Sequence, residues 1–213
     1  MGYIERRFMP RISVSGPHGV GKSTLIAALK NTPKIEKRFT FKDGIIRSVT
    51  KNRIRTNEYG LDNTQLLVMA KFLEHSTIPN TILDKCSLDG LVYTAYLYEN
   101  NQVKKSTLQV AESIFENVRY DIYFYIAPES AILATETPSN TMEIRNRISE
   151  LFEEYIQAYK LPIIRLSGKL SERVSQFVET IDMYDKWVKA ERKEHEKYMR
   201  SIDWSKEKIS IKV

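Results

Sequence analysis

The sequence predicts an α/β fold in which helices cover both faces of a parallel β-sheet. Short runs rich in β-branched and aromatic residues recur at wide intervals, and segments with helical spacing of apolar residues fill the intervals. Strands that alternate with helices imply βαβ crossovers, which place helices on both faces of a parallel sheet. The 213 residues contain no internal repeat and no clear linker, and they suffice for one sizeable core. We therefore expect a three-layer sandwich with a five-stranded parallel sheet.

The expected strands are short and mostly apolar. The first precedes a glycine-rich loop, the third and fourth are the runs "TILD" and "DIYFYIA", and the fifth is "PIIRLS". Their expected ranges are 11–15, about 38–42, 81–84, 121–127 and 162–167.

The expected helices rest on apolar residues that recur three and four positions apart. The first begins at the glycine-rich loop, the second carries Leu66, Ala70 and Leu73 on one face, and the third is strongly apolar. Their expected ranges are 22–29, 62–74, 87–98, 106–118, 142–159 and 169–183, and a second, highly charged helix is expected in the tail. The polar stretch 135–141 predicts a loop.

Two parts of unequal size are expected along the chain. Residues 1–182 form the α/β domain, with a helical lid at about 135–150. Residues 183–213 form a charged, partly helical C-terminal extension. Its large apolar residues are too widely spaced to decide whether it pairs two copies of the chain into a homodimer.

Composition excludes several classes of protein. Hydrophobic residues make up 42% of the chain and charged residues 28%, as in soluble globular proteins. No run of 18 apolar residues occurs and the first residues lack the apolar core of a signal peptide, so we expect neither membrane insertion nor secretion. The expected location is cytoplasmic, in the host cytoplasm if the protein is viral. The single cysteine, Cys86, rules out an internal disulfide and a cysteine-based metal cage.

The net charge of +6 is unevenly placed along the chain. Residues 34–55 contain eight lysines and arginines against two acidic residues, and residues 184–213 contain nine against six. Such basic segments bind nucleotides, nucleic acid or anionic lipid, although a solvated surface explains the tail equally well.

The stretch "ISVSGPHGVGKSTL" contains the P-loop pattern, in which Gly16 and four further residues precede Gly21-Lys22-Ser23. The glycines let backbone N–H groups surround phosphates at the start of a helix. Lys22 would neutralise β- and γ-phosphate oxygens, and the Ser23 hydroxyl would ligate Mg²⁺. We therefore expect a P-loop NTPase fold with ATP as ligand and Mg²⁺ as cofactor. The expected ATP-binding residues are Gly16, Pro17, His18, Gly19, Val20, Gly21, Lys22, Ser23 and Thr24.

The end of the third expected strand separates classes of P-loop protein. It ends in Asp84-Lys85, where motor and AAA-type ATPases have an acidic pair, and the Asn-Lys-x-Asp motif of common GTPases is absent from the sequence. We expect Asp84 to hold a water of the Mg²⁺ shell or to accept a hydrogen bond from an acceptor hydroxyl. Its alternative role is to cap the helix that begins near Ser87.

Two arginines follow the polar loop at 135–141. Arg145 and Arg147 suit a lid over transferring phosphates, because a guanidinium binds phosphate oxygens bidentately and stays charged. The alternative for either arginine is an ordinary surface ion pair with Glu143 or Glu150.

Five stretches of the sequence resemble the P-loop nucleoside and nucleotide kinases. The similarity covers about residues 10–182; it is closest to nicotinamide riboside kinase-like ATPase domains and more distant to thymidylate and deoxynucleoside kinases. The stretches are "ISVSGPHGVGKSTL", "TNEYGLDNTQLLVMAKFLEH", "TILDKCSLDGLVYTAYLYEN", "DIYFYIAPES" and "LPIIRLSGKLSERVSQFVETI".

The resemblance implies roles for residues beyond the P-loop. It places Lys85 where these kinases have an arginine, and Asp43 where a carboxylate often activates the acceptor hydroxyl. The acceptor-binding residues that it implies are Arg47, Gln65, Lys85 and Tyr93, although helical spacing also fits Tyr93 to a core position. Together with the lid arginines and the P-loop, the expected catalytic residues are Lys22, Asp43, Asp84, Arg145 and Arg147.

We therefore expect a kinase that transfers the γ-phosphate of ATP to a small nucleoside or nucleoside monophosphate. One alternative is a nucleic-acid kinase that binds DNA through residues 34–55 and the tail. It would phosphorylate a hydroxymethylated base such as 5-hydroxymethyluracil in viral DNA, or a polynucleotide end. A second alternative is a nucleotide-dependent ATPase switch.

Overall fold

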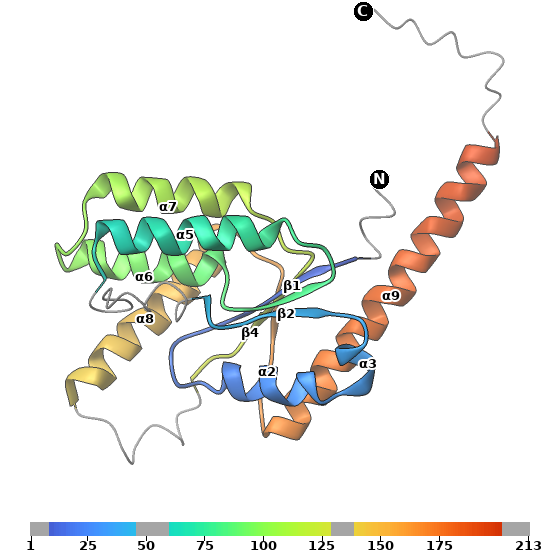
Figure 1. Ribbon diagram of the computed structural model, residues 1–213, viewed down its shortest axis with the longest axis horizontal. Coiled ribbons are helices and arrows are strands. Elements are labelled where there is room, and N and C mark those ends of the chain that lie inside the picture. The colour runs from blue at the N-terminus through green and yellow to red at the C-terminus, as the bar shows by residue number, and fades with distance from the viewer. Residues whose placement is uncertain (1–8, 46–59, 129–138, 202–213) are drawn as a thin grey trace, which may run out of the picture.

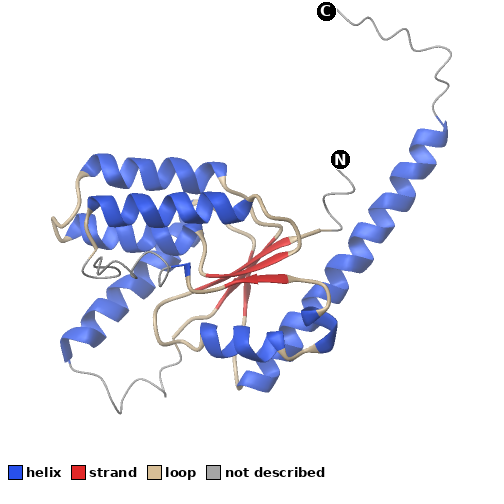
Figure 2. Cartoon of the chain, in the orientation of Figure 1, coloured by secondary structure: helices blue, strands red, loops and turns tan. Residues whose placement is uncertain are grey.

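A computed structural model describes residues 9–45, 60–128 and 139–201 of the chain. Within these ranges, five parallel strands form a sheet in the order β2-β3-β1-β4-β5. Helices cover both faces of this sheet, as Figures 1 and 2 show. The predicted α/β sandwich of three layers is confirmed.

The strands lie close to their expected positions. They are β1 (Arg11–Ser15), β2 (Thr40–Lys42), β3 (Thr81–Asp84), β4 (Ile122–Tyr125) and β5 (Ile163–Arg165). The helices of the described residues are α2 (Lys22–Lys30), α3 (Pro33–Glu36), α5 (Asp62–Ser76), α6 (Ser87–Glu99), α7 (Lys105–Asn117), α8 (Ser139–Ala158) and α9 (Leu170–Ser201). The short helix α3 was not expected; it begins at a proline, whose missing N–H costs no hydrogen bond at that position.

Side chains alternate across the sheet and form a separate apolar core on each face. Ile12 and Val14 of β1 join the core formed with α2, α3 and α9, where Phe124 of β4 stacks on Phe177 of α9. Tyr123 and Tyr125 of β4 point to the opposite face and join the core formed with α5, α6, α7 and α8. Strand β4 is buried on both faces and consists entirely of large apolar and aromatic residues. Strands β1 and β3 are also largely buried, but they combine apolar residues with buried polar ones such as Ser13 and Thr81.

Helix α9 is a single uninterrupted helix that passes through position 183, where we expected one helix to end and another to begin. Two ion pairs tie its middle to the segment before β2: Lys34 with Asp182, and Arg38 with Asp185. Its C-terminal part extends away from the sheet in Figure 1. Among the described helices, none is both long and apolar enough to cross a membrane.

Candidate active site

The glycine-rich loop lies at the carboxyl edge of the sheet, between the end of β1 and the first turn of α2. At Gly16, φ is 142° and an added Cβ would lie 2.3 Å from the backbone oxygen of Ile126, so only glycine fits. Gly21 precedes α2 with φ of 91°, in the left-handed region that favours glycine. The backbone N–H groups of the loop therefore adjoin the N-terminus of α2, which favours an anion.

Lys22 is held inside this loop. Its ammonium donates hydrogen bonds to the backbone oxygens of Gly16 at 2.5 Å and Pro17 at 2.6 Å, and only 6% of the residue is exposed. Burial lowers the pKa of Lys22 to about 8, and the nearby charges of Lys85 and Arg145 add to that effect, while Asp89 and Asp84 oppose it. The loop thus brings the positive charges of Lys85 and Arg145 near the buried ammonium of Lys22.

Ser23 and Asp84 form the candidate Mg²⁺ site. The Ser23 hydroxyl donates a hydrogen bond to Asp84 Oδ2 at 3.0 Å, and Asp84 Oδ1 is buried without a hydrogen-bond partner among the described residues. A hydroxyl beside a carboxylate oxygen with spare acceptor capacity is a donor set that suits Mg²⁺. The described residues contain no cluster of three or more His, Cys, Asp or Glu side chains for a metal. Mg²⁺ at this position would need further oxygen ligands besides these two side chains.

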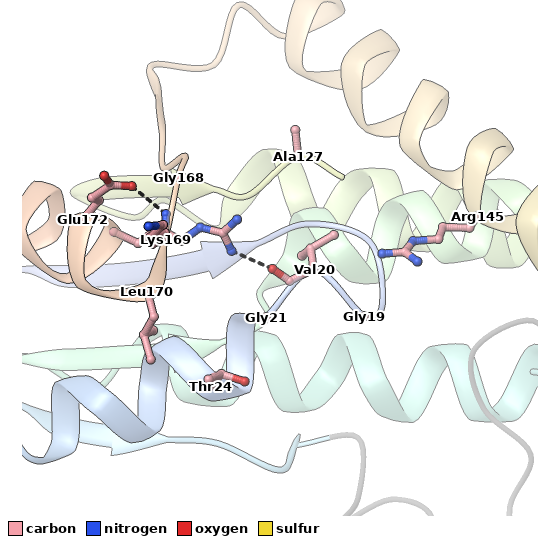
Figure 3. A pocket seen from close by; sticks show the side chains of 11 residues that line it. Gly19, Val20, Gly21, Thr24, Ala127, Arg145, Gly168, Lys169, Leu170 and Glu172 are labelled. Atoms are coloured by element: carbon pink, nitrogen blue, oxygen red, sulfur yellow. Dashed lines mark hydrogen bonds between the residues drawn. The ribbon is translucent and has the colours of Figure 1, made fainter. Parts of the chain in front are cut away.

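A cavity of about 560 Å³ opens beside the loop, as Figure 3 shows. It is lined by Gly19, Val20, Gly21, Thr24, Ala127, Arg145, Gly168, Lys169, Leu170, Glu172 and Arg173. Arg173 of α9 is buried and donates a hydrogen bond to the backbone oxygen of Val20 at 2.8 Å. The cavity thus joins the loop to the start of α9.

Arg145 of α8 reaches the same loop. Its Nη2 atom lies 3.4 Å from the position that a Cβ on Gly19 would take, and its Nε atom is buried without a hydrogen-bond partner among the described residues. Burial lowers the pKa of Arg145. This predicted lid arginine therefore lies where it can contact an anion in the loop.

Lys85, Tyr93 and His18 form a second group on the α6 side of the loop. Lys85 has φ of 75°, a strained conformation for a residue with a side chain, and its ammonium lies 5.5 Å from the centre of the Tyr93 ring. The Tyr93 hydroxyl lies within hydrogen-bond distance of His18 Nδ1, at 3.1 Å. Two of the predicted acceptor residues, Lys85 and Tyr93, are thus brought together with the loop.

Arg147, the second predicted lid arginine, is not brought to the loop. Its guanidinium bonds to Glu99 of α6 through Nε at 2.9 Å and Nη2 at 2.6 Å, and Nη1 contacts Glu150 and Glu154. Hydrogen bonds to Glu99 and Glu154 raise the pKa of Arg147. The ion-pair alternative, including the contact with Glu150, describes its position in the structure.

Two other predicted residues, Gln65 and Asp43, have surroundings away from the loop cations, and a third is not among the described residues. Gln65 is buried between α5 and α6, where its Oε1 accepts a hydrogen bond from the Thr94 hydroxyl at 3.1 Å. Asp43 follows β2, and its carboxylate pairs with Lys30 of α2 at 2.8 Å. Arg47 lies outside the described residues. The side chain of Gln65 is therefore engaged between the two helices.

Asp89 and Arg173 adjoin the loop but were not predicted from the sequence. Asp89 is 1% exposed, and its Oδ1 lies 3.4 Å from the backbone nitrogen of Gly16. Burial raises the pKa of Asp89, against the charges of Lys22 and Lys85, which lower it. An acidic residue three positions after the N-cap Cys86 is a local capping signal, but nothing local indicates the contact with the loop.

The sequence of the chain matches a known family. Residues 11–173, more than half of the chain, match the family model described as AAA domain. No curated protein matches the chain.

Several solved structures share the fold at low sequence identity. A deoxyadenosine kinase from M. mycoides with dCMP and dCDP bound is 15% identical, with a TM-score of 0.60 over 81% of this chain and 98% of that chain. YorR protein from Bacillus subtilis, in complex with phosphorylated GDP, is 14% identical, with a TM-score of 0.55 over 82% and 97%. NadR protein in complex with NR is 15% identical, with a TM-score of 0.56 over 78% of this chain. The chain spans only 46% of the NadR chain.

The chain differs from typical AAA-type ATPases at the end of one strand. Strand β3 ends in Asp84-Lys85, so the acidic pair expected of AAA-type ATPases is absent at that strand end. The P-loop itself, with Lys22 and Ser23 at the start of α2, is present at every fixed position. The chain belongs to the AAA domain family of P-loop proteins, and it has the fold of the P-loop nucleoside and nucleotide kinases.

Proposed function

We propose that the protein is an ATP-dependent kinase that transfers the γ-phosphate to a nucleoside or nucleotide acceptor. The observation that carries the proposal is the group of four basic side chains around the glycine loop: Lys22, Lys85, Arg145 and Arg173. Lys22 and Arg173 are buried, Lys85 and Arg145 are partly buried, and the nearby carboxylates of Asp84 and Asp89 offset only part of this positive charge. Burial of like charges costs free energy unless anionic groups compensate for it. A triphosphate in the loop supplies those negative charges.

The donor ATP would occupy the loop and the adjoining cavity. A volume of about 560 Å³ is typical of a small-molecule site and leaves room for the base and ribose beside Arg173. Lys22 would exchange the backbone oxygens of Gly16 and Pro17 for β- and γ-phosphate oxygens. This exchange would relieve the cost of the buried ammonium.

Ser23 and Asp84 would hold Mg²⁺, which neutralises phosphate charge when it is bound. Arg145 would contact the transferring phosphoryl group from the other side of the loop, since its guanidinium lies beside Gly19. Closure of α8 over the donor would exclude water, so that the phosphate passes to an acceptor and not to solvent.

The acceptor would lie on the α6 side of the loop, next to Lys85, Tyr93 and His18. Asp43 or Asp84 would orient its hydroxyl, and Arg47 would hold an acceptor phosphate. The names of the structural neighbours support this acceptor class, because one is a deoxyadenosine kinase with dCMP and dCDP bound and another is NadR with NR bound.

The nucleic-acid alternative has less support than the small acceptor. Lys34 and Arg38, two cations of the basic segment, are paired with Asp182 and Asp185 of α9. Cations that are paired within the chain contribute less to the counterion release that drives binding to DNA. The ATPase alternative lacks an acidic pair at the end of β3. The homodimer and the cytoplasmic location remain predictions.

The test is to follow the label of ATP carrying ³²P on its γ-phosphate, with nucleosides, nucleoside monophosphates and hydroxymethylated DNA offered as acceptors. We expect the label in a nucleoside or nucleotide product. Lys22→Ala should abolish transfer and leave the circular dichroism spectrum unchanged. Lys71→Ala, a matched change at an exposed lysine of α5 that pairs with Glu74, should leave the rate unchanged. Label released only as inorganic phosphate would contradict a kinase, and label in DNA alone would favour the nucleic-acid alternative.

A further inference from the structure

The mechanism proposed above leaves one buried carboxylate beside the loop without a role. Asp89 is the third residue of α6 and is 1% exposed. Its Oδ1 accepts a hydrogen bond from the backbone N–H of Gly16 at 3.4 Å, and its Oδ2 accepts one from the backbone N–H of Cys86 at 2.9 Å. The two donors belong to different parts of the chain, the first residue of the glycine loop and the residue that caps α6.

Only a carboxylate suits this pair of donors. An ionised carboxylate accepts hydrogen bonds at both oxygen atoms, whereas an asparagine amide presents one oxygen and one NH₂ group. An amide at position 89 would therefore turn a donor toward one of the two backbone N–H groups. The resulting unpaired buried donor costs about as much as a lost hydrogen bond.

Helix α6 also contacts the loop one turn further on. The Tyr93 hydroxyl lies 3.1 Å from Nδ1 of His18, two residues after Gly16. Asp89 and Tyr93 are four positions apart and so lie on the same side of α6. The start of the loop is therefore fastened to this helix at two points.

We infer that Asp89 is a positioning residue for the donor nucleotide: its carboxylate fastens Gly16 to the N-terminus of α6 and so holds the loop in the form that receives a triphosphate. The inference rests on the proposed function, because it takes ATP as the ligand. Asp89 itself acts through the backbone of Gly16 and contacts no substrate.

A second role for Asp89 predicts the opposite effect on ATP binding. A negative charge close to the loop repels the phosphates of ATP. If this repulsion were the main effect of the Asp89 charge, its removal would tighten ATP binding. Loss of positioning weakens ATP binding instead, so the sign of the change separates the two roles.

The experiment compares Asp89→Asn with the wild-type protein by calorimetric titration with ATP and Mg²⁺, below the unfolding temperature of each. We expect the Kd for ATP to rise about tenfold, the size of one charged hydrogen bond. The matched control is Asp62→Asn, since Asp62 also accepts hydrogen bonds near a helix start, from the backbone N–H of Lys104 and the hydroxyl of Thr107. That variant should change the unfolding temperature and leave the Kd for ATP unchanged.

An unchanged or lower Kd in Asp89→Asn would overturn the inference while the proposed function stands. A wild-type protein that binds no ATP would overturn both. If Asp89→Asn does not fold, amide exchange of the nucleotide-free wild-type protein, measured by NMR, decides the question. The N–H of Gly16 should exchange slowly because Asp89 accepts its hydrogen bond, and fast exchange would overturn the inference.

Discussion

Lys22 shows how a single buried charge in the free protein can favour binding of an anion. Its ammonium is almost fully buried, and its hydrogen-bond partners are two backbone oxygens, which carry no net charge. Burial removes water from the ammonium and lowers the pKa of Lys22 to about 8, although the charges of Asp89 and Asp84 oppose this effect. A phosphate chain provides the charged partner that the carbonyls do not, so binding of ATP should raise this pKa again.

The affinity for ATP should therefore depend on pH through Lys22. A cation whose pKa rises on binding contributes fully below its free pKa and progressively less above it. The free pKa is about 8, so the Kd for ATP should be constant up to about pH 8 and then rise, by up to about tenfold per pH unit. Calorimetric titrations between pH 7.5 and 9.5 measure this slope. A Kd that stays constant to pH 9.5 would contradict the prediction, and Lys22→Ala should abolish the dependence.

The positions that could be located from the sequence are those whose signal is local. Gly16, Gly21, Lys22 and Ser23 form a fixed pattern within eight residues, and the structure places them in the glycine-rich loop and the first turn of α2. Asp89 contacts a residue 73 positions away, so spacing alone does not indicate its contact. Arg173 lies 153 positions from its partner Val20, and its helix looks like an ordinary amphipathic helix in the sequence.

Helix α8 gives its two arginines different surroundings. Residues two positions apart lie about 200° apart around a helix. Arg145 accordingly lies beside Gly19, while Arg147 bonds to both carboxylate oxygens of Glu99 on α6. One arginine is available to the loop, and the other fastens α8 to its neighbour.

This division predicts different outcomes for two similar substitutions. Arg145→Ala should lower kcat by about 10²-fold, the size expected for loss of one group that stabilises transition-state charge. Arg147→Ala should leave kcat within about threefold and lower the unfolding temperature by a few degrees at most, because its ion pairs are partly exposed. Steady-state kinetics and thermal unfolding of both variants test this. Equal losses of kcat would contradict the division.

Among the helices and strands, some bounds follow from the local sequence pattern and others do not. The sequence predicted β1, β3 and β4 close to their observed ranges, because each contains apolar or aromatic residues that are buried in the sheet. The break expected near position 183 is absent, and α9 contains no glycine or proline that would end it there. Ion pairs of Asp182 and Asp185 with the segment before β2 lie at that point of α9. Such partners are distant in sequence and leave no local signal.

At the scale of the whole molecule, the glycine loop lies between two helical layers that carry different groups. Arg173 of α9 lies in the layer that also contains α2, while Lys85 and Tyr93 lie next to and within α6 in the opposite layer. Ligands of open α/β sheets bind at the carboxyl ends of the strands, where this loop is placed. The alternation of strands and helices in the sequence predicts this architecture. It does not identify the acceptor, because the strand order determines at which edge of the sheet a ligand binds and not which ligand binds there.

The central claim is that the loop and its adjoining cavity hold the triphosphate of a donor nucleotide. A crystal structure with Mg²⁺ and AMP-PNP tests it most directly. We predict the triphosphate in the loop between Gly16 and Gly21, with Lys22 moved from the backbone oxygens to phosphate oxygens and Arg145 within about 3.2 Å of the γ-phosphate. A triphosphate bound elsewhere, or one in the loop with Lys22 still on the oxygens of Gly16 and Pro17, would contradict the claim.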